Sequence, residues 1–185
     1  MYGLVNRAIE DLVRSRFGDE AWGAICRRAG IERPSFVGMQ PYDDAITYGL
    51  VGAAAAELQI DAAAVLETFG EHWMTYTVEE GYGDLLSMMG STFEQFLDNL
   101  DAMHGRIQAQ MPALRPPHLR REAQPDGSSI LHYRSERPGL AAMVVGLLRG
   151  LAKRYGIELD VERLPDEPPP ADAGLARFSI RRRQP

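Results

Sequence analysis

This sequence of 185 residues contains a single cysteine and only four histidines, so few side chains are available to bind a metal ion. The lone Cys26 excludes an internal disulfide, a cysteine-rich zinc site and an iron–sulfur cluster. The histidines form no H-x-x-x-H pattern, and no C-x-x-C pair is present, so a zinc site built by the protein alone is not expected. Any metal bound here must obtain most of its ligands from elsewhere.

The sequence also lacks a long apolar run, an N-terminal leader and an excess of positive charge. Its longest apolar runs, Leu50–Ala56 and Leu140–Leu148, are well short of the ~18 residues that a membrane-spanning helix needs. The first residues have no basic region followed by an apolar core, as a signal peptide would. A formal charge of −6 at pH 7 disfavours binding to nucleic acid. These features predict a cytoplasmic protein that binds neither membranes nor nucleic acid.

The pattern of apolar residues predicts helices first and strands later. Through the first two-thirds of the chain, apolar side chains recur at i, i+3 and i+4, and capping residues, glycines and prolines divide this part into helices. Beyond Pro116-Pro117 the segments resemble strands, with a turn at Pro125-Asp126-Gly127. The predicted helices cover residues 4–13, 20–28, 43–58, 61–81, 91–112 and 139–155, the predicted strands cover 118–123, 129–137, 157–163 and 175–181, and residues 165–171 are a predicted loop. This order predicts an α+β fold, in which an N-terminal helical part is followed by a small antiparallel sheet with an intervening helix.

His104 lies on the apolar stripe of a predicted helix that starts at the capping-box pattern Ser91-Thr92-Phe93-Glu94. It follows Leu97 by seven residues and Leu100 by four, and so shares their buried face. A buried imidazole needs a hydrogen-bond partner or a metal, because burying an unpaired polar group costs about 1–3 kcal/mol. Two interpretations are open. His104 is either a core histidine bonded to a backbone carbonyl or the single protein ligand of a haem iron, whose porphyrin supplies four nitrogens.

A second group of polar residues lies in the predicted strand 129–137. Tyr133, Ser135 and Arg137 alternate along it, so their side chains are expected on one face. Two hydroxyls and a guanidinium suit a pair of carboxylates, such as the two propionates of a haem, because arginine offers a charge-assisted fork. The alternative is an exposed edge strand whose charges do nothing specific. Neither pattern decides the function alone.

Together the two patterns resemble the H-NOX family, the haem-nitric oxide/oxygen binding domains that include the haem domain of the soluble guanylate cyclase beta subunit. The resemblance extends over essentially the whole chain. The segments that carry it are Met1–Asn6, Tyr42–Asp44, Phe69-Gly70, Glu80–Tyr82, Phe96–His104, Leu131–Tyr133 and Arg137–Leu140. It implies one domain over residues 1–185, with a distal helical subdomain over 1–60, a proximal subdomain over 61–185, and a haem buried between the helical part and the sheet.

The resemblance also implies roles for the polar residues. In the family, the residue that matches His104 is the sole proximal ligand of a b-type haem, ferrous iron protoporphyrin IX. The absence of C-x-x-C-H agrees, because covalent attachment of the haem would need it. Tyr133, Ser135 and Arg137 match the propionate-binding motif of the family without substitution.

The distal side of the haem decides which gas binds. In family members that bind O2, a distal tyrosine donates a hydrogen bond to it, and the resemblance places Met143 at that position, or Ala142 if the register slips by one. Neither side chain donates. Such a donor is worth about 1–3 kcal/mol to bound O2 and much less to nitric oxide. The other expected distal residues are apolar or bulky: Val5, Ile9, Trp73, Met74 and Leu147. The resemblance therefore implies a site that binds nitric oxide, and also CO, and excludes O2, unless Trp73 or Tyr76 supplies a donor.

The family mechanism is a mechanical switch. Pro117 matches the proline that presses on the porphyrin and distorts it, with Pro116 as the alternative. Nitric oxide weakens the bond from iron to His104, and its loss relaxes the haem and shifts the helix that carries His104. Since 185 residues leave no room for an output domain, the expected partner is a separate signalling protein, such as a sensor histidine kinase or a cyclic-di-GMP enzyme.

Other functions compete with this interpretation. One is an O2-binding haem sensor or carrier of the same fold, and another, of a different class, is a haem-free interaction domain. A hydrolase that uses Ser135 and His104 is disfavoured because the sequence has no G-x-S-x-G elbow. A haem peroxidase would need a distal His–Arg pair, and His72 and His118 are expected at the surface or in loops. The sequence therefore predicts a sensor and not an enzyme.

Overall fold

The computed structural model describes residues 1–32, 35–165 and 174–183. Its helices are α1 (Gly3–Arg28), α2 (Asp44–Leu58), α3 (Ala62–Thr77), the π-helical turn η1 (Val78–Tyr82), α4 (Gly83–Ser87), α5 (Phe93–Gln110) and α6 (Ala141–Arg154). Its strands are β1 (His118–Ala123), β2 (Ser129–Arg134), β3 (Leu159–Arg163) and β4 (Leu175–Arg182). The fold is α+β, as the sequence predicts. Residues 166–171 of the predicted loop lie outside the described residues.

Capping residues and glycines set the bounds of the first helices. Gly18 has φ +85° and bends α1 between the two helices predicted there. Asp43 and Asp61 cap α2 and α3, because each side chain accepts a hydrogen bond from the backbone N–H two residues on, at 2.9 and 2.6 Å. After α3, the turn η1 contains Gly81 at φ +93° and leads the chain into α4. The helix predicted over 61–81 is therefore two elements.

The start of α5 differs from the prediction by one residue. The expected capping box paired Ser91 with Glu94. In the structure Thr92 is the cap: its Oγ1 accepts from the Gln95 N–H at 3.2 Å, and the Gln95 side chain accepts from the Ser91 N–H at 2.9 Å. The patterns S-x-x-E and T-x-x-Q both satisfy the motif, so the sequence alone did not choose between them. Glu94 binds Arg182 instead.

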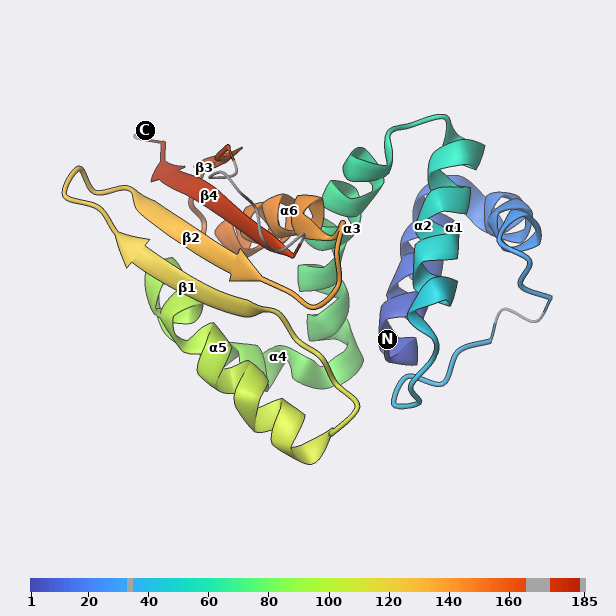
Figure 1. Ribbon diagram of the computed structural model, residues 1–185, viewed down its shortest axis with the longest axis horizontal. Helices are drawn as coiled ribbons and strands as arrows, with labels where there is room; N and C mark the ends of the chain where they lie inside the picture. The colour runs from blue at the N-terminus through green and yellow to red at the C-terminus, as the bar shows by residue number, and fades with distance from the viewer. Residues whose placement is uncertain (33–34, 166–173, 184–185) are drawn as a thin grey trace.

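The four strands form one antiparallel sheet in the order β1-β2-β4-β3 (Figure 1). Alternate residues of β2 and β4 are buried, as the two-residue period of a strand requires. These side chains pack with those of α4, α5 and α6 into one cluster, which we call the proximal core. Its strand members include Leu119, Leu131, Tyr133, Phe178 and Ile180.

Some predicted bounds in this part are wrong. The predicted strand 129–137 ends at Arg134, which pairs with His118 at the start of β1 and with Leu175 at the start of β4. Beyond Arg134 the pairing continues only as one backbone hydrogen bond, from the Ser135 N–H to the Gly174 carbonyl oxygen at 2.9 Å, and the chain then turns at Gly139, with φ +80°. The helix predicted over 139–155 covers Ala141–Arg154, and the strand predicted from residue 157 begins at 159.

A second cluster, the distal core, is formed by α1, α2 and one face of α3. Its most buried members include Trp22, Ile25 and Leu50. Figure 1 shows α1 and α2 on one side of the molecule, the sheet with α4 and α5 on the other, and α3 between them. Within the described ranges, no single helix is long and apolar enough to cross a membrane, and only α2 taken with residues 62–87, bent by 112° from it, meets that test as a pair.

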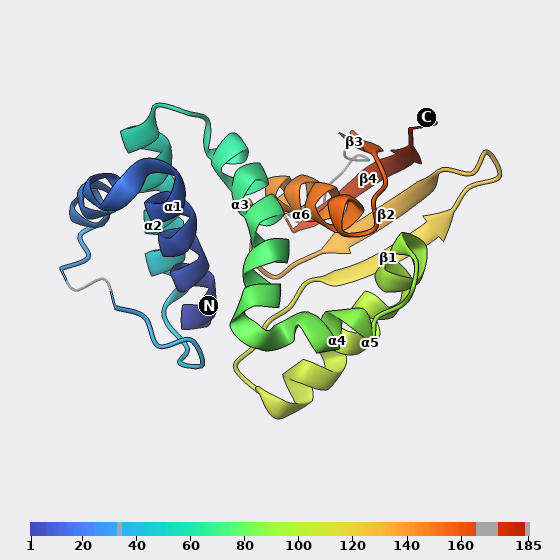
Figure 2. The same cartoon turned by 180° about the vertical axis from the view of Figure 1, so that it is seen from behind.

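Glycines bring α3 and α6 into backbone contact. A Cβ atom on Gly146 would lie 1.8 Å from the carbonyl oxygen of Glu67, and one on Gly70 would lie 2.2 Å from that of Met143. No side chain fits at either position, so each glycine is required by close approach. Gly150 extends the same contact toward the end of α6. Seen from behind, α6 lies across the sheet and meets α3 (Figure 2).

Candidate functional site

His104 lies on α5 where the helix passes the segment that leads into β1. Its helix neighbours Leu100, Met103 and Ile107 pack in or against the proximal core, and His104 itself is half-buried. Burial lowers the pKa of His104 below its usual value, although a hydrogen bond to the backbone of Pro117 opposes the change. The imidazole is therefore neutral at physiological pH, which is the form that binds a metal.

The hydrogen bond of His104 determines which ring nitrogen carries the proton. Nδ1 lies 3.1 Å from the carbonyl oxygen of Pro117. A carbonyl only accepts, so in the neutral ring Nδ1 holds the proton and donates it. Nε2 then carries a lone pair, and it has no hydrogen-bond partner among the residues that the structure describes. The hydrogen bond to a backbone carbonyl that is expected for a core histidine is therefore present. It leaves Nε2 unprotonated, which is the form in which a histidine nitrogen binds a metal.

Arg137 reaches from the turn after β2 to the start of α2. Its Nε donates to Asp44 Oδ2 at 2.6 Å, its Nη2 to Asp44 Oδ1 at 3.2 Å, and its Nη1 to the carbonyl oxygen of Arg115 at 2.6 Å. The amino group of Met1 also binds Asp44. Burial acts to raise the pKa of Asp44, but the bonds from Arg137 and the amino group outweigh it and hold the pKa below its usual value. The guanidinium thus holds a carboxylate in a bidentate fork.

Tyr133 and Ser135 lie beside Arg137, but the predicted reason is wrong. Because β2 ends at Arg134, Ser135 and Arg137 follow the strand and do not alternate within it. The Ser135 hydroxyl instead accepts from the backbone N–H of Arg137 at 3.0 Å and so holds the turn. Burial raises the pKa of the Tyr133 hydroxyl, while the Ser135 hydroxyl and the Arg137 charge oppose the change. The turn, and not a strand face, brings the three side chains together.

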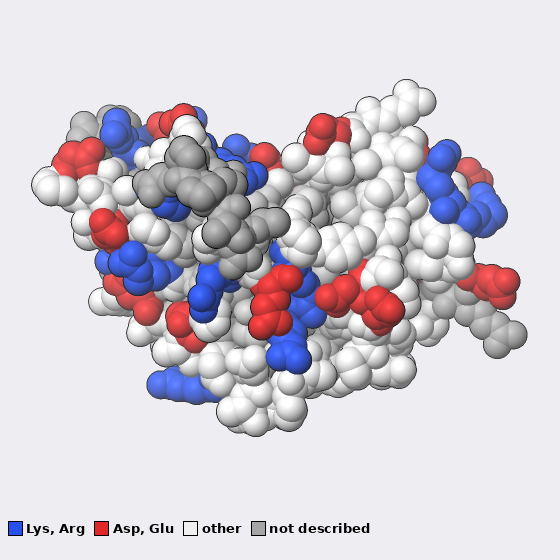
Figure 3. Space-filling view, in the orientation of Figure 1, with Lys and Arg blue, Asp and Glu red and all other residues white. Residues whose placement is uncertain are grey.

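Two residues of α2 complete this cluster and were not predicted as site residues. Asp44 accepts the Arg137 fork, and the Tyr48 hydroxyl donates to the carbonyl oxygen of Pro138 at 2.9 Å. Both contacts join the helical part to the turn after β2, and Figure 3 shows side chains of both charges where the two parts meet. The chain contains 26 acidic residues, and nothing in the sequence identifies Asp44 among them as the partner of Arg137.

Four of the predicted distal residues gather at the distal core. Val5, Ile9, Trp73 and Met143 pack in or against it, and the Trp73 ring lies 5.9 Å from that of Phe69. Met143 lies in the first turn of α6. Its thioether offers no N–H or O–H donor.

The other two predicted distal residues lie elsewhere. Met74 packs against the proximal core, and its Cγ would be 3.0 Å from a Cβ atom on Gly150. Leu147 lies beside Gly70 in the contact between α3 and α6. Helix α3 therefore presents Trp73 to the distal core and the next residue, Met74, to the proximal core.

His72 and Tyr76 lie between α3 and α1. The His72 Nε2 is 2.9 Å from Asp11 Oδ2, although the two are not aligned for a hydrogen bond. Burial lowers the pKa of His72 despite this carboxylate, and burial raises the pKa of Tyr76 to about 12. The His72 side chain is 14% exposed, so the expected surface position is wrong, whereas His118 is 63% exposed. The phenol of Tyr76 has the charged groups of Arg7 and Asp11 on α1 as neighbours.

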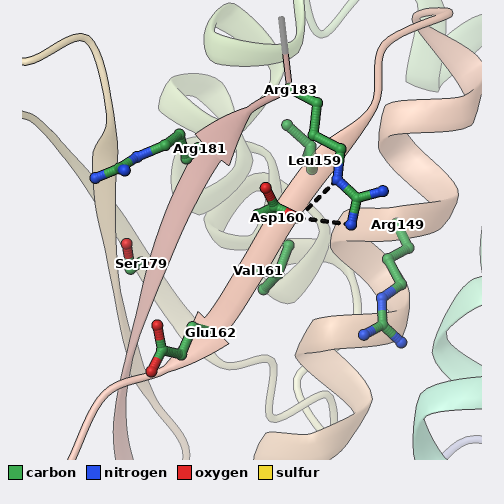
Figure 4. A pocket seen from close by; sticks show the side chains of 8 residues that line it. All are labelled: Arg149, Leu159, Asp160, Val161, Glu162, Ser179, Arg181 and Arg183. Carbon is green, nitrogen blue, oxygen red and sulfur yellow. Dashed lines mark hydrogen bonds and ion pairs between the residues drawn. The ribbon is translucent and has the colours of Figure 1, made fainter.

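A separate open pocket lies beside β3 and β4 (Figure 4). Its walls are Arg149, Leu159, Asp160, Val161, Glu162, Ser179, Arg181 and Arg183. Arg183 pairs with Asp160 at 2.6 Å inside this pocket. None of the predicted site residues lines it. Within the described ranges, no three His, Cys, Asp or Glu side chains are grouped so that they could hold a metal ion.

Comparison with known proteins assigns this arrangement to a family. The model of the haem-NO-binding family matches residues 2–163. Soluble guanylate cyclase gcy-32 of Caenorhabditis elegans is 35% identical over 164 residues, which cover 87% of this chain and 24% of that protein. Soluble guanylate cyclase gcy-34 of the same organism is 33% identical over 156 residues, covering 83% and 23%. The chain therefore spans about a quarter of the length of these relatives.

Solved structures show the same fold. An H-NOX protein from S. oneidensis in the Fe(II)NO ligation state superposes with a TM-score of 0.85 at 19% identity and covers 100% of both chains. An oxygen-binding H-NOX domain related to soluble guanylate cyclases, solved as its oxygen complex, gives a TM-score of 0.78 at 17% identity and covers 100% of this chain and 96% of that one. This chain belongs to the H-NOX family of haem-binding gas sensor domains. The region it shares with the cyclases is their sensor domain and not their catalytic domain.

The residues present fit a haem. His104 offers a neutral Nε2 with a free lone pair, as a porphyrin iron requires of its axial ligand. Arg137 already holds a carboxylate in a fork, which is the chemistry of a propionate. Half-buried apolar side chains line the edges of both cores, Val5, Trp73 and Met143 on one and Leu100 and Ile107 on the other. They would cover the two faces of an apolar ring.

Proposed function

We propose that this chain binds a b-type haem in the ferrous state through His104 and senses nitric oxide. The observation that carries the proposal is the hydrogen bond from His104 Nδ1 to the Pro117 carbonyl, because it leaves Nε2 of this half-buried imidazole unprotonated and able to bind a metal. When bound, the haem supplies the iron at which the gas binds. His104 would be its axial ligand, Tyr133, Ser135 and Arg137 would hold the propionates, and Pro117 would press on the ring.

The choice of gas follows from the distal side. Met143 occupies the start of α6 without a donor group, beside the apolar Val5 and Ile9. Bound O2 is stabilised by a hydrogen bond worth about 1–3 kcal/mol, whereas nitric oxide needs it far less. Tyr76 also belongs to the distal core, where its ring lies 6.4 Å from that of Trp73, and its phenol has the charged groups of Arg7, Glu80 and Asp11 as neighbours. The proposed site therefore binds nitric oxide, and CO, and excludes O2.

Signalling would pass from His104 to its helix. On this proposal, residues 1–60 form a distal subdomain and residues 61–185 a proximal one, and loss of the iron–His104 bond shifts α5 relative to the N-terminal helices. A partner reads the shift only if it binds the two states with different affinity. We expect that partner to be a separate cytoplasmic signalling protein, such as a sensor histidine kinase or a cyclic-di-GMP enzyme.

An absorption spectrum of the reduced protein tests the choice of gas. In air we expect the spectrum of a five-coordinate ferrous haem without O2, and after addition of nitric oxide that of a five-coordinate nitrosyl. A stable ferrous-oxy spectrum in air would contradict the exclusion of O2. A colourless protein that takes up no added haem would contradict the proposal as a whole.

The role of His104 has its own test. The His104→Gly variant should lose its axial ligand, and imidazole added to the solution should restore the original spectrum. His118→Gly is the matched control, since His118 is exposed and hydrogen-bonds Asp101. A spectrum of the His104→Gly variant unchanged without imidazole would show that another residue binds the iron.

A further inference from the structure

One face of α5 carries a row of polar side chains that binds the segment running antiparallel to it. The row, which we call the polar row, consists of Glu94, Asp98, Asp101, His104 and Gln108. Their spacing of four, three, three and four residues places them along one stripe of the helix. Each member has a hydrogen-bond partner in residues 114–121 or in β4. Figure 1 shows α5 lying along β1, where these contacts are made.

The two ion pairs of the row are bidentate. Arg121 of β1 donates from Nε and Nη2 to the two carboxylate oxygens of Asp98 at 2.8 and 2.7 Å. Arg182 of β4 donates in the same way to Glu94, at 3.0 and 2.7 Å. The Arg121 side chain is only 16% exposed and also donates to Ser129 of β2 at 3.2 Å, so its guanidinium links α5 to two strands. Bidentate pairs fix relative orientation as well as distance.

The remaining contacts lead directly to the histidine. Asp101 accepts from the backbone N–H of Leu119 at 3.3 Å and lies 3.2 Å from the His118 ring. One turn further along α5, His104 donates to Pro117, and Gln108 then donates to the carbonyl oxygen of Leu114 at 3.2 Å. The bond that orients the imidazole is therefore one member of a continuous series. A displacement of His104 along with α5 must strain or break the neighbouring members.

We infer that Glu94, Asp98 and Asp101 are positioning residues that hold α5 at one place on the sheet and thereby limit how far His104 moves when it separates from the iron. The inference rests on the proposed function for its consequence at the iron, but the restraint on α5 is a property of the chain alone. Because the ion pairs are partly exposed, each restrains the helix weakly, so α5 is held in place without being locked.

Hydrogen exchange measures the restraint in the haem-loaded chain of 185 residues without nitric oxide. In Asp98→Asn, the amides of α5 should exchange about two- to fivefold faster than in the parent protein, while those of α6 are unchanged. The control is Asp160→Asn, which removes an exposed carboxylate of β3 that pairs with Arg183, the residue directly after β4, away from α5 (Figure 4). It should leave the exchange of α5 as it was. Equal exchange of α5 in the parent protein and Asp98→Asn would overturn the inference.

A charge exchange separates an ion pair from a general loss of structure. Glu94→Arg alone should speed exchange in the first turns of α5, and adding Arg182→Glu should restore most of the protection. Failure of the double variant to recover would contradict an electrostatic restraint.

The last measurement concerns the iron. With nitric oxide added, Asp98→Asn should show a larger ratio of five- to six-coordinate nitrosyl bands, by about two- to fivefold, since a freer helix lets His104 move further away. An unchanged ratio alongside faster exchange would mean that the row restrains α5 but does not act on His104. A protein without haem would contradict the proposed function, while the exchange comparison would still decide whether the row restrains the helix.

Discussion

Helix α3 meets α6 backbone to backbone at glycines, with two exposed ion pairs at the edge of the contact, whereas α5 meets the sheet along one side through charged side chains. In the first contact, Gly70 and Gly146 bring backbone against backbone, and a single added carbon would overlap a carbonyl oxygen. Such a close-packed contact has one arrangement and resists displacement. In the second contact, partly exposed ion pairs such as Asp98–Arg121 hold the outer stripe of α5, while Phe93, Phe96 and Met103 fill the proximal core on its inner side. Exposed pairs contribute about 0–1 kcal/mol each and tolerate small movements.

The two contacts differ in how much movement they allow. The contact between α3 and α6 ties together the two helices that supply Trp73 and Met143, so the distal side of the site has little freedom. The helix that carries His104 is instead held by several weak contacts. In the proposed sensor, the pocket that selects the gas stays in place while the histidine is the part that moves.

The largest expected effect is on the glycine contact. Gly146→Ala would place a methyl group 1.8 Å from the Glu67 carbonyl oxygen, so α3 and α6 must separate, at a cost of about 3 kcal/mol or more in the free energy of unfolding. Gly49→Ala in α2 is the matched control, because nothing lies within 4 Å of its Cβ position, and alanine there should be neutral or stabilise by about 0.5–1 kcal/mol. Urea denaturation measures both. Equal stability of the two variants would show that the close contact is not needed.

A smaller loss is expected where the two parts meet at Arg137. Arg137→Met keeps an unbranched apolar stem but removes the fork to Asp44 and the bond to the Arg115 carbonyl, which should cost about 1–3 kcal/mol of unfolding free energy. Arg149→Met removes a more exposed bond, to Glu67, and should cost less than about 0.5 kcal/mol. If both variants lose the same amount, the Arg137 cluster is an ordinary surface pair.

Acidification of the haem-free protein tests whether the fold keeps His72 and His104 in their neutral form. The pKa values of His72 and His104 are below the value of about 6.5 that applies in the unfolded chain. The unfolded state therefore binds more protons, and the free energy of unfolding of the haem-free protein should fall as the pH drops below about 6.5. Thermal unfolding between pH 7 and pH 5.5 measures this. His72→Gln should reduce the slope, and greater stability at the lower pH would contradict burial of the two neutral rings.

The smallest expected effect is that of ionic strength, which should act differently on the contact of α5 with the sheet and on the contact of α6 with α3. Raising the ionic strength from about 0.05 to 0.5 M shortens the screening length to a few ångströms and weakens exposed ion pairs by fractions of a kcal/mol. Hydrogen exchange in α5 should become slightly faster. Exchange in α6 should change less, because its contact with α3 rests mainly on the close backbone approach at the glycines, with the ion pairs Arg149–Glu67 and Lys153–Glu71 only at its exposed edge. Equal acceleration in both helices would indicate a general loss of stability.

Much of the fold could be predicted from the local pattern of residues. Asp43, Asp61 and Gly18 act on their immediate neighbours, and their roles were visible in the sequence. The α+β order was also predicted, because the period of apolar residues changes from helical to extended after Pro117. The end of β2 was not predicted. It depends on where β1 and β4 begin, and those residues are far away in the chain.

Some features of the candidate site could likewise be predicted from the sequence, and others could not. The sequence by itself determined that His104 lies on a partly buried face of its helix and that Arg137 suits a carboxylate, since both follow from spacing and side-chain chemistry. Only the tertiary structure decided that Pro117 holds the imidazole tautomer, that Asp44 meets Arg137, and that Met74 and Trp73 face different cores. The physical reason is that a hydrogen bond or a packing contact depends on distance in space. Segments distant along the chain become neighbours only when the helices and the sheet have packed.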